Sequence, residues 1–220
     1  MSTLPYIAPP QAPLHYLHVD AALLVVDKPS GLLSVPGRGA DKADCLVARV
    51  QADYPDARIV HRLDMETSGL MVLAREAETH RALSMQFQQR LVKKRYIAVV
   101  DGLLAAASGT IDLPLITDWP NRPRQKVDFT LGKPSLTHYQ VLAYDAAENT
   151  SRVALEPETG RSHQLRVHLM SLSHAILGDA LYASPAVQQK APRLLLHAEY
   201  LAFAHPQTGA AMEFSLPEAF

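Results

Sequence analysis

Short apolar runs alternate with polar clusters along most of the chain. Residues 21–27 are apolar and β-branched, which predicts a strand that ends at the turn signal Lys28-Pro29-Ser30-Gly31. Similar runs predict further strands near residues 59–60, 70–74, 94–100, 110–116, 137–144, 151–156, 194–197 and 212–216. These strands outnumber the predicted helices and follow one another like hairpins. The pattern favours an α+β fold with a largely antiparallel or mixed central sheet flanked by helices.

Three segments show the spacing of amphipathic helices, and they cover residues 45–54, 76–91 and 162–172. Asp44 is a candidate N-cap for the first helix and Ser162 for the third. The predicted apolar faces consist of Leu46, Val47 and Val50, then Leu83, Phe87 and Leu91, then Leu165, Leu169 and Leu172. Each helix therefore has one face that can cover a sheet.

Composition indicates a single folded domain. The chain has 220 residues, of which 48% are hydrophobic, enough for one substantial core. We expect an extended arm over residues 1–18 and one catalytic domain over residues 19–220. The single cysteine, Cys45, excludes a disulfide within the chain and favours a reducing compartment. Neither a signal peptide nor an apolar run of membrane-spanning length occurs, so we expect a cytoplasmic protein without membrane association.

The charge is balanced in sum but not in distribution. A formal net charge of −1 by itself argues against a nucleic-acid partner, because phosphate binding requires cations. However, residues 79–100 contain no acidic residue, and Arg122, Arg124 and Lys126 follow Trp119 closely. Any one such group is usually a solvated surface. Three groups beside polar motifs, the third containing Arg161 and Arg166, favour a phosphate-bearing ligand.

A polar cluster between two apolar runs contains the main candidate for chemistry. His61-Arg62-Leu63-Asp64 and Glu66-Thr67-Ser68-Gly69 separate the run ending at Val60 from the run beginning at Leu70. Asp64 is a carboxylate that can act as nucleophile, base or electrostatic stabiliser. It could equally cap the following turn. Arg62 is two residues away, so on extended backbone both side chains point to the same side.

Several other chemistries lack their sequence signatures. His163 and His168 are five residues apart, which does not place them on one face of a helix, and HExxH and paired cysteines are absent. The nucleophile elbow G-x-S-x-G and the Gly-rich phosphate loops are also absent. We therefore expect neither a metal nor a cofactor.

The chain resembles the RluA family of RNA pseudouridine synthases from about Val19 onward. His61-Arg62-Leu63-Asp64-Met65-Glu66-Thr67-Ser68-Gly69 is similar to the family's catalytic motif, in which the aspartate is essential. Lys94-Arg95-Tyr96-Ile97-Ala98 resembles the motif of its active-site tyrosine. Gly160-Arg161-Ser162-His163-Gln164-Leu165-Arg166 resembles the motif whose last arginine pairs with the catalytic aspartate. Lys28-Pro29-Ser30-Gly31-Leu32 and Gly178-Asp179 match as well.

The resemblance implies isomerisation of uridine in RNA, in a cleft across the sheet. Asp64 would be the central catalyst, as nucleophile at C1′ or as base at the 2′ position, and Arg166 would favour its ionised form. Tyr96 would stack on the uracil, and Leu165 would pack on the other side of the pocket. The target base must leave its stack, and Arg62 is the candidate for occupying the vacated space. Further expected RNA contacts are His61, Lys94, Arg122, Arg124, Lys126 and Arg161, with Trp119 either stacking on a loop base or buried as a structural residue.

Within the family, the length and the Asp118–Pro123 loop are similar to the dual-specificity branch, which acts on stem-loops of 23S rRNA and tRNA, including the anticodon stem-loop. Departures from the family pattern occur at Asp27 and Ala175, outside the catalytic motifs. We expect no N-terminal S4 domain, and a monomer is the simplest state. Two rival functions stay open: a non-catalytic RNA-binding module of the same fold, and a glycoside hydrolase that would use Asp64 with Glu66.

Overall fold

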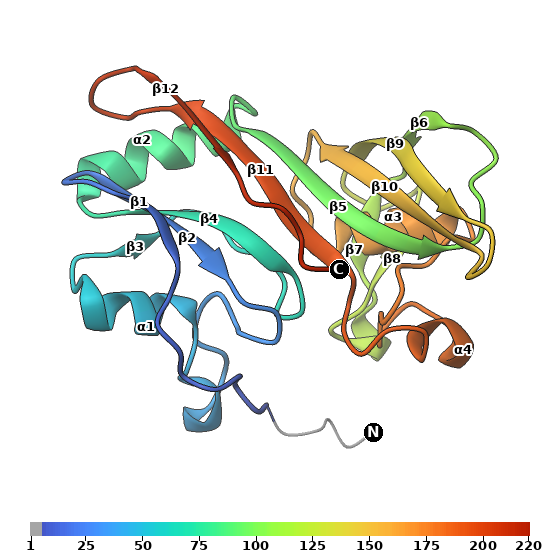
Figure 1. Ribbon diagram of the computed structural model, residues 1–220. Helices are drawn as coiled ribbons and strands as arrows, with labels where there is room; N and C mark the ends of the chain where they lie inside the picture. Colours follow the sequence, from blue (N-terminus) through green and yellow to red (C-terminus); the bar gives the residue numbers. More distant parts are fainter. Residues whose placement is uncertain (1–5) are drawn as a thin grey trace. The chain divides into compact units, whose positions relative to one another are not determined.

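The computed structural model describes residues 6–220 and divides into two compact units. The first unit contains the described residues through Lys93 together with Ala198–Glu218. The second unit contains Lys94–His197 and Ala219–Phe220. Figure 1 labels the helices and strands of both units. Sheet strands dominate each unit and helices are few, so the predicted α+β class is confirmed.

The first unit is built on strands in the order β1-β2-β4-β11, with β3 beside β4 and β12 beside β11. The bounds are β1 Tyr16–Val19, β2 Leu23–Lys28, β3 Arg58–Ile59, β4 Ser68–Ala74, β11 Leu196–Ala204 and β12 Ala211–Ser215. β2 pairs antiparallel with β1 and with β4, β3 pairs antiparallel with β4, and β12 pairs antiparallel with β11. β4 is buried along its whole length, as its uninterrupted apolar run requires.

Two helices accompany this sheet, α1 (Leu46–Asp53) and α2 (Ala77–Gln88). Leu83 of α2 packs with Leu70 and Val72 of β4 in the core of the unit, and Phe87 borders the same cluster. Leu91 was predicted to continue this apolar face, but the helix ends before it and its side chain is 60% exposed. The N-cap of α1 is Cys45; Asp44 instead forms an ion pair with Arg49.

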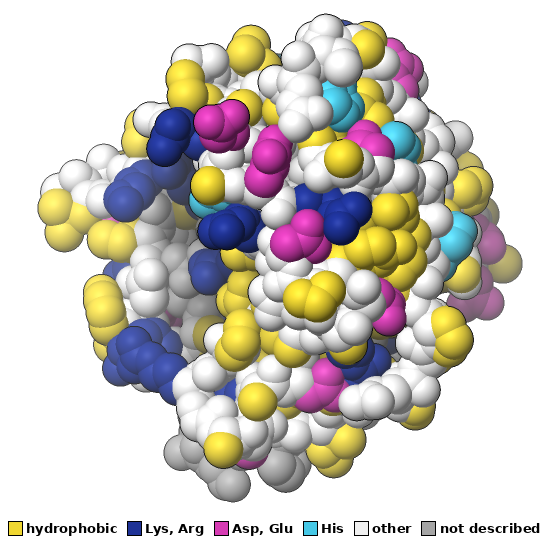
Figure 2. Space-filling model, turned by 90° about the vertical axis from the view of Figure 1, so that its left-hand side faces the viewer, with side chains coloured by type: hydrophobic (Ala, Val, Ile, Leu, Met, Phe, Trp, Pro, Cys, Tyr) yellow, Lys and Arg dark blue, Asp and Glu magenta, His cyan; other side chains and the backbone are white. Residues whose placement is uncertain are grey.

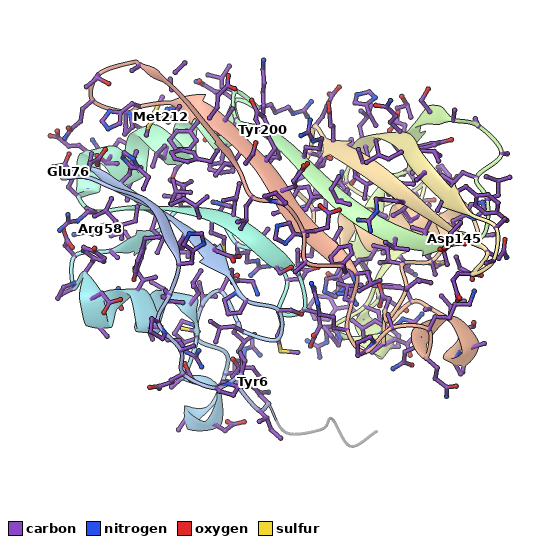
Figure 3. The ribbon with its side chains drawn as sticks, in the orientation of Figure 1. Tyr6, Arg58, Glu76, Asp145, Tyr200 and Met212 are labelled. Atoms are coloured by element: carbon purple, nitrogen blue, oxygen red, sulfur yellow. The ribbon has the colours of Figure 1, made fainter. Side chains whose placement is uncertain are left out.

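The predicted arm at the chain start is shorter than residues 1–18, because β1 already begins at Tyr16. Residues 1–5 of that prediction lie outside the described residues. Tyr6, labelled in Figure 3, donates its hydroxyl hydrogen bond to the carbonyl of Asp44. Arg49 donates to the carbonyls of Pro9 and Pro10. The described part of the arm is thus attached to the segment that leads into α1.

The second unit has its main strands in the order β5-β10-β9-β6, and β7 and β8 form a separate pair. The bounds are β5 Lys93–Asp101, β6 Ser108–Asp112, β7 Leu115–Thr117, β8 Gln125–Val127, β9 Leu136–Asp145 and β10 Thr150–Pro157. All of these pairings are antiparallel. The single strand predicted over residues 110–116 is wrong: Pro114 lacks a backbone donor, and the segment splits there into β6 and β7.

Helix α3 (Gln164–Ser171) covers the core of the second unit, and the short α4 (Pro185–Gln188) lies nearer the surface in Figure 1. Leu165 and Leu169 pack with Val100, Val153 and Leu155. The predicted cap Ser162 is wrong, because His163 occupies the N-cap position in the left-handed region, with φ 54° and ψ 19°. Leu172, predicted as part of the apolar face, is 37% exposed.

Candidate active site

The segment that contains Asp64 is the aspartate loop, residues 60–67, which connects β3 to β4 in the first unit. The two apolar runs predicted to flank it are these strands, and they pair with each other. Ser34 fixes the loop from one side: its Oγ donates to the Leu63 carbonyl (2.7 Å) and accepts from the Leu63 N–H (3.1 Å). The Thr67 N–H donates to the Asp64 carbonyl. These hydrogen bonds hold the backbone on both sides of Asp64.

Lys28 at the end of β2 is the central support of this loop. Its ammonium is fully buried and donates to the carbonyls of Pro29, Leu32 and Met65 at 2.9, 2.7 and 2.9 Å. Burial lowers the pKa of Lys28 to about 7, because a charged amine is poorly solvated there, although nearby Glu66 and Asp64 oppose the shift. The ammonium thus joins the Lys-Pro-Ser-Gly turn to the residue that follows Asp64.

Exposure alternates along the loop. Arg62 is exposed, Leu63 is buried at 7% exposure, and Asp64 is half-buried. The alternation agrees with extended backbone that directs Arg62 and Asp64 away from the core. The Arg62 guanidinium and the Asp64 carboxylate can therefore both be reached from solvent by a ligand.

His61 has contacts within the first unit that anchor the start of the loop. The Val72 N–H donates to its Nε2 (3.1 Å), and its ring stacks on Phe87 with 4.5 Å between centroids. Both contacts orient the imidazole against β4 and α2. Its predicted contact with RNA stays a prediction.

Gly69 shows that the end of the motif is part of the sheet. Ser68 and Gly69 are the first two residues of β4. Gly69 has φ +112°, and a Cβ there would lie 2.4 Å from the carbonyl oxygen of Ala198 in β11. Only glycine allows β11 to approach so closely at the exit of the aspartate loop.

In the second unit, two predicted site residues border one hydrophobic cluster. Tyr96 lies on β5 opposite Leu155 of β10 and is half-buried. It packs against the cluster that contains Leu165, the second residue of α3. The structure thus brings the predicted tyrosine and leucine to the same cluster, and Lys94 precedes Tyr96 on β5.

Arg166 has a partner that sequence reasoning did not identify. Its Nε and Nη2 donate to Oδ2 and Oδ1 of Asp179 at 2.8 and 2.7 Å, and both side chains are almost completely buried. A bidentate pair of this kind fixes the plane of the guanidinium. Arg166 is therefore a buried residue of α3 and not a surface one, while its predicted pairing with Asp64 stays a prediction.

The basic residues that follow Trp119 are exposed, as RNA contacts require. Trp119 itself is 64% exposed, which excludes the buried alternative, and the Arg122 guanidinium lies 4.6 Å from its ring centre. Arg122, Arg124 and Lys126 all lie on or beside the β7–β8 hairpin. Arg161 is exposed and donates to the Pro134 carbonyl. Figure 2 shows Lys and Arg side chains gathered in groups on the face it displays.

Two further properties concern the described part of the chain. Within residues 6–220, no three His, Cys, Asp or Glu side chains are grouped so that they could hold a metal ion. In the same residues, no helix has the length and apolar character needed to cross a membrane.

Sequence reasoning missed the supporting residues rather than the predicted catalytic ones. Lys28 was treated as part of a turn, but it is the last residue of β2 and is buried there, which is rare for a lysine. Asp179 was noted only because Gly178-Asp179 matches the family pattern, and its pairing with Arg166 was not predicted. The sequence also did not indicate the contact of Tyr182 with Gln125. These contacts join segments distant in sequence, which periodicity does not detect.

The structure has an α+β fold, with the aspartate loop in the first unit and a half-buried tyrosine and a buried arginine in the second. A family model described as RNA pseudouridylate synthase matches residues 22–171. The chain therefore belongs to the RNA pseudouridylate synthase family. Membership makes it an isomerase, and the predicted family and enzyme class are confirmed.

Individual relatives and solved structures agree with this assignment. The chain is 55% identical to "Dual-specificity RNA pseudouridine synthase RluA" of Escherichia coli (strain K12), over 96% of this chain and 97% of that protein. It is 49% identical to the protein of the same name from Pasteurella multocida, over both full lengths. "Human RNA Pseudouridylate Synthase Domain Containing 1" has a similar structure, with TM-score 0.79, 29% identity, and coverage of 96% of this chain and 87% of that chain.

Proposed function

We propose that the protein isomerises uridine to pseudouridine in stem-loops of both 23S rRNA and tRNA, including the anticodon stem-loop. The support is the dual-specificity name of relatives that match 96% or more of this chain. In this reaction the bond between N1 and C1′ breaks and a bond between C5 and C1′ forms. The hydrogen on C5 is released as a proton and N1 gains one, so no oxidant or cofactor is required.

Asp64 is the proposed catalytic residue, acting on the same nucleotide as Tyr96 and Arg166. The observation that carries this role is the hydrogen bonding of the aspartate loop, where Ser34 and Lys28 bind backbone carbonyls on either side of a half-buried Asp64. Catalytic groups held in advance in this way lose little entropy when the substrate binds. Tyr96 and Leu165 provide an apolar surface for the uracil ring.

Arg62 is the proposed wedge that enters the RNA when the target base flips out. Its exposure two residues before Asp64 supports this role. Trp119, Arg122, Arg124, Lys126, Lys94, Arg161 and His61 are the further proposed RNA contacts. We propose that the protein works in the cytoplasm, where both RNAs occur, and that it acts as a monomer.

Tritium release from uridine labelled at C5 tests the proposal directly. We expect release from transcripts of a 23S rRNA stem-loop and of a tRNA anticodon stem-loop, and loss of release in Asp64→Asn. Glu66→Gln is the matched control, because a hydrolase would need both carboxylates whereas a synthase needs only Asp64. Absence of release by the wild-type protein on every RNA would support a non-catalytic RNA-binding module instead.

A further inference from the structure

Tyr182 is a buried residue whose backbone is tied to Arg166. Its side chain lies in the hydrophobic cluster of Leu115 and Val167 and is 7% exposed. Oδ1 of Asp179 accepts from the Tyr182 N–H at 3.1 Å and from Arg166 Nη2 at 2.7 Å. The Asp179 carboxylate therefore binds both the backbone N–H of Tyr182 and the guanidinium of Arg166.

The face of the Tyr182 ring also contacts two arginines. The Arg166 guanidinium carbon lies 5.1 Å from the ring centre, and that of Arg124 lies 5.4 Å from it. Both distances fall within the range of cation–π attraction. Arg124 precedes β8 directly, so the ring connects the proposed RNA-binding hairpin to the proposed active-site arginine.

The hydroxyl of Tyr182 reaches the same two parts of the second unit. The Gln125 N–H in β8 donates to it at 2.7 Å. His163 Nδ1, at the N-cap of α3, lies 2.7 Å from it in a second hydrogen bond. A single oxygen atom thus joins the start of β8 to the start of α3, which contains Arg166.

The backbone of His163 is strained where it makes this contact. Its left-handed conformation, with φ 54°, is unfavourable for a residue with a Cβ. Such a conformation persists only when surrounding contacts stabilise it, and it is often associated with functional positions. The hydrogen bond with Tyr182 is one such contact.

We propose that Tyr182 is a positioning residue that holds the β7–β8 hairpin, with Trp119 and Arg122, in a fixed relation to Arg166. The inference rests on the proposed function, because it concerns how the RNA-binding hairpin and the reaction are coupled. Tyr182 does not touch the reacting atoms in this proposal. It contributes by keeping the hairpin in the conformation that binds the stem-loop, so its removal affects RNA binding more than chemistry.

Tyr182→Phe removes the hydroxyl and keeps the ring. We expect it to raise KM for an anticodon stem-loop about tenfold, which corresponds to about 1.4 kcal/mol and is typical of lost hydrogen bonds. The kcat should stay within about twofold of the wild-type value, because the Arg166–Asp179 pair does not involve the hydroxyl. A purely global destabilisation would lower the active fraction, and hence apparent kcat, instead of raising KM.

Trp119 supplies a readout that does not depend on activity. It is the single tryptophan of the chain, so time-resolved fluorescence anisotropy reports the local motion of the hairpin alone. In Tyr182→Phe without RNA, we expect a larger amplitude of the fast, nanosecond component. His163→Asn tests the other end of the contact, since asparagine tolerates the left-handed conformation but lacks the ring, and it should increase the same amplitude.

Tyr144→Phe is the matched control, because it removes a tyrosine hydroxyl bonded to Asn149 in the same unit but distant in sequence from the hairpin. It should leave both KM and the anisotropy decay at wild-type values. Wild-type KM and wild-type Trp119 motion in both Tyr182→Phe and His163→Asn would overturn the inference. Failure of the wild-type protein to form pseudouridine would overturn the proposed function instead, and the anisotropy experiment separates the two outcomes.

Discussion

The ammonium of Lys28 shows how one buried residue holds the aspartate loop. Three carbonyl groups surround it, and Met65, which supplies one of them, directly follows Asp64. Burial without a directly bonded carboxylate lowers the pKa, so the charge of Lys28 destabilises the folded protein most at and below pH 7, and this cost falls as pH rises above 7. The residue therefore links the stability of the loop to pH.

The sign of this linkage can be tested with Lys28→Met. Between the folded pKa of about 7 and the unfolded value of about 10.4, the unfolded chain binds more protons at this residue. The free energy of unfolding of the wild type should therefore rise relative to that of Lys28→Met as pH increases from 7 to 9, by at most about 1.4 kcal/mol per pH unit. Urea unfolding at each pH measures the difference.

Lys93→Met provides the control for this experiment, because Lys93 is an exposed lysine of the same unit. Its difference from the wild type should stay constant with pH. Parallel pH profiles for the wild type and Lys28→Met would contradict the lowered pKa.

Arg62 offers a test of base flipping at the scale of one side chain. We expect Arg62→Ala to slow single-turnover pseudouridine formation by about 100-fold, since flipping costs a few kcal/mol that the wedge offsets. Thermal unfolding should be unchanged, because Arg62 is exposed. Arg58→Ala removes another exposed arginine of the first unit, labelled in Figure 3, and should leave the rate near wild type.

A substrate with a lower flipping cost separates the wedge role from simple phosphate binding. An abasic residue next to the target uridine weakens its stacking and should restore most of the rate of Arg62→Ala. A defect of equal size on both substrates would contradict the wedge.

The packing of β4 against β11 determines what the exit of the aspartate loop can tolerate. We expect Gly69→Ala to lower the free energy of unfolding by about 3 kcal/mol or more, because the new Cβ would meet backbone atoms of Ala198 and φ is positive. Gly209→Ala measures the cost of the positive φ alone, because φ is +73° there but a Cβ would meet no atom within 4 Å. Its cost should be about 1 kcal/mol. Equal costs in urea unfolding would contradict the close approach.

Elements with a strong apolar pattern were predictable from sequence. The strand over residues 94–100 and the pair over residues 137–144 and 151–156 are observed as β5, β9 and β10, each within a few residues. Errors occurred where a local signal was ambiguous. Leu91 had the spacing of the α2 face, but the helix ends before it, and Ser162 had the chemistry of a cap that His163 occupies. Helix ends depend on tertiary contacts as well as on propensity.

The candidate site was predictable only in part, for a physical reason. Asp64, Tyr96 and Arg166 stand out through residue type and motif, but the contacts that position them join distant segments. Arg166 pairs with Asp179, and Lys28 reaches Met65 across 37 residues. Neither contact follows from local spacing, and the residue types alone allow many partners. The family resemblance predicted what these residues do, whereas the structure identified the residues that hold them in place.

For the whole molecule, the net charge of −1 gives no general attraction to RNA, so binding must depend on local basic groups. Each phosphate contact releases counterions, and log K therefore falls linearly with log salt concentration. With the Asp64→Asn protein, which we expect to be inactive, the affinity for a stem-loop should fall steeply between about 50 and about 200 mM salt. Filter binding or fluorescence titration at several salt concentrations measures the slope.

The slope of log K against log salt concentration also identifies which basic residues bind the RNA phosphates. Arg122→Ala and Lys126→Ala should each reduce its magnitude by about 1, because each removes one proposed phosphate contact. Lys190→Ala is the control, since Lys190 forms an ion pair with Asp101 instead. A salt-independent affinity, or a slope reduced equally by Lys190→Ala, would show that the hairpin does not bind the RNA backbone. A reduced slope confined to the hairpin variants would explain how a protein of near-zero net charge binds a polyanion.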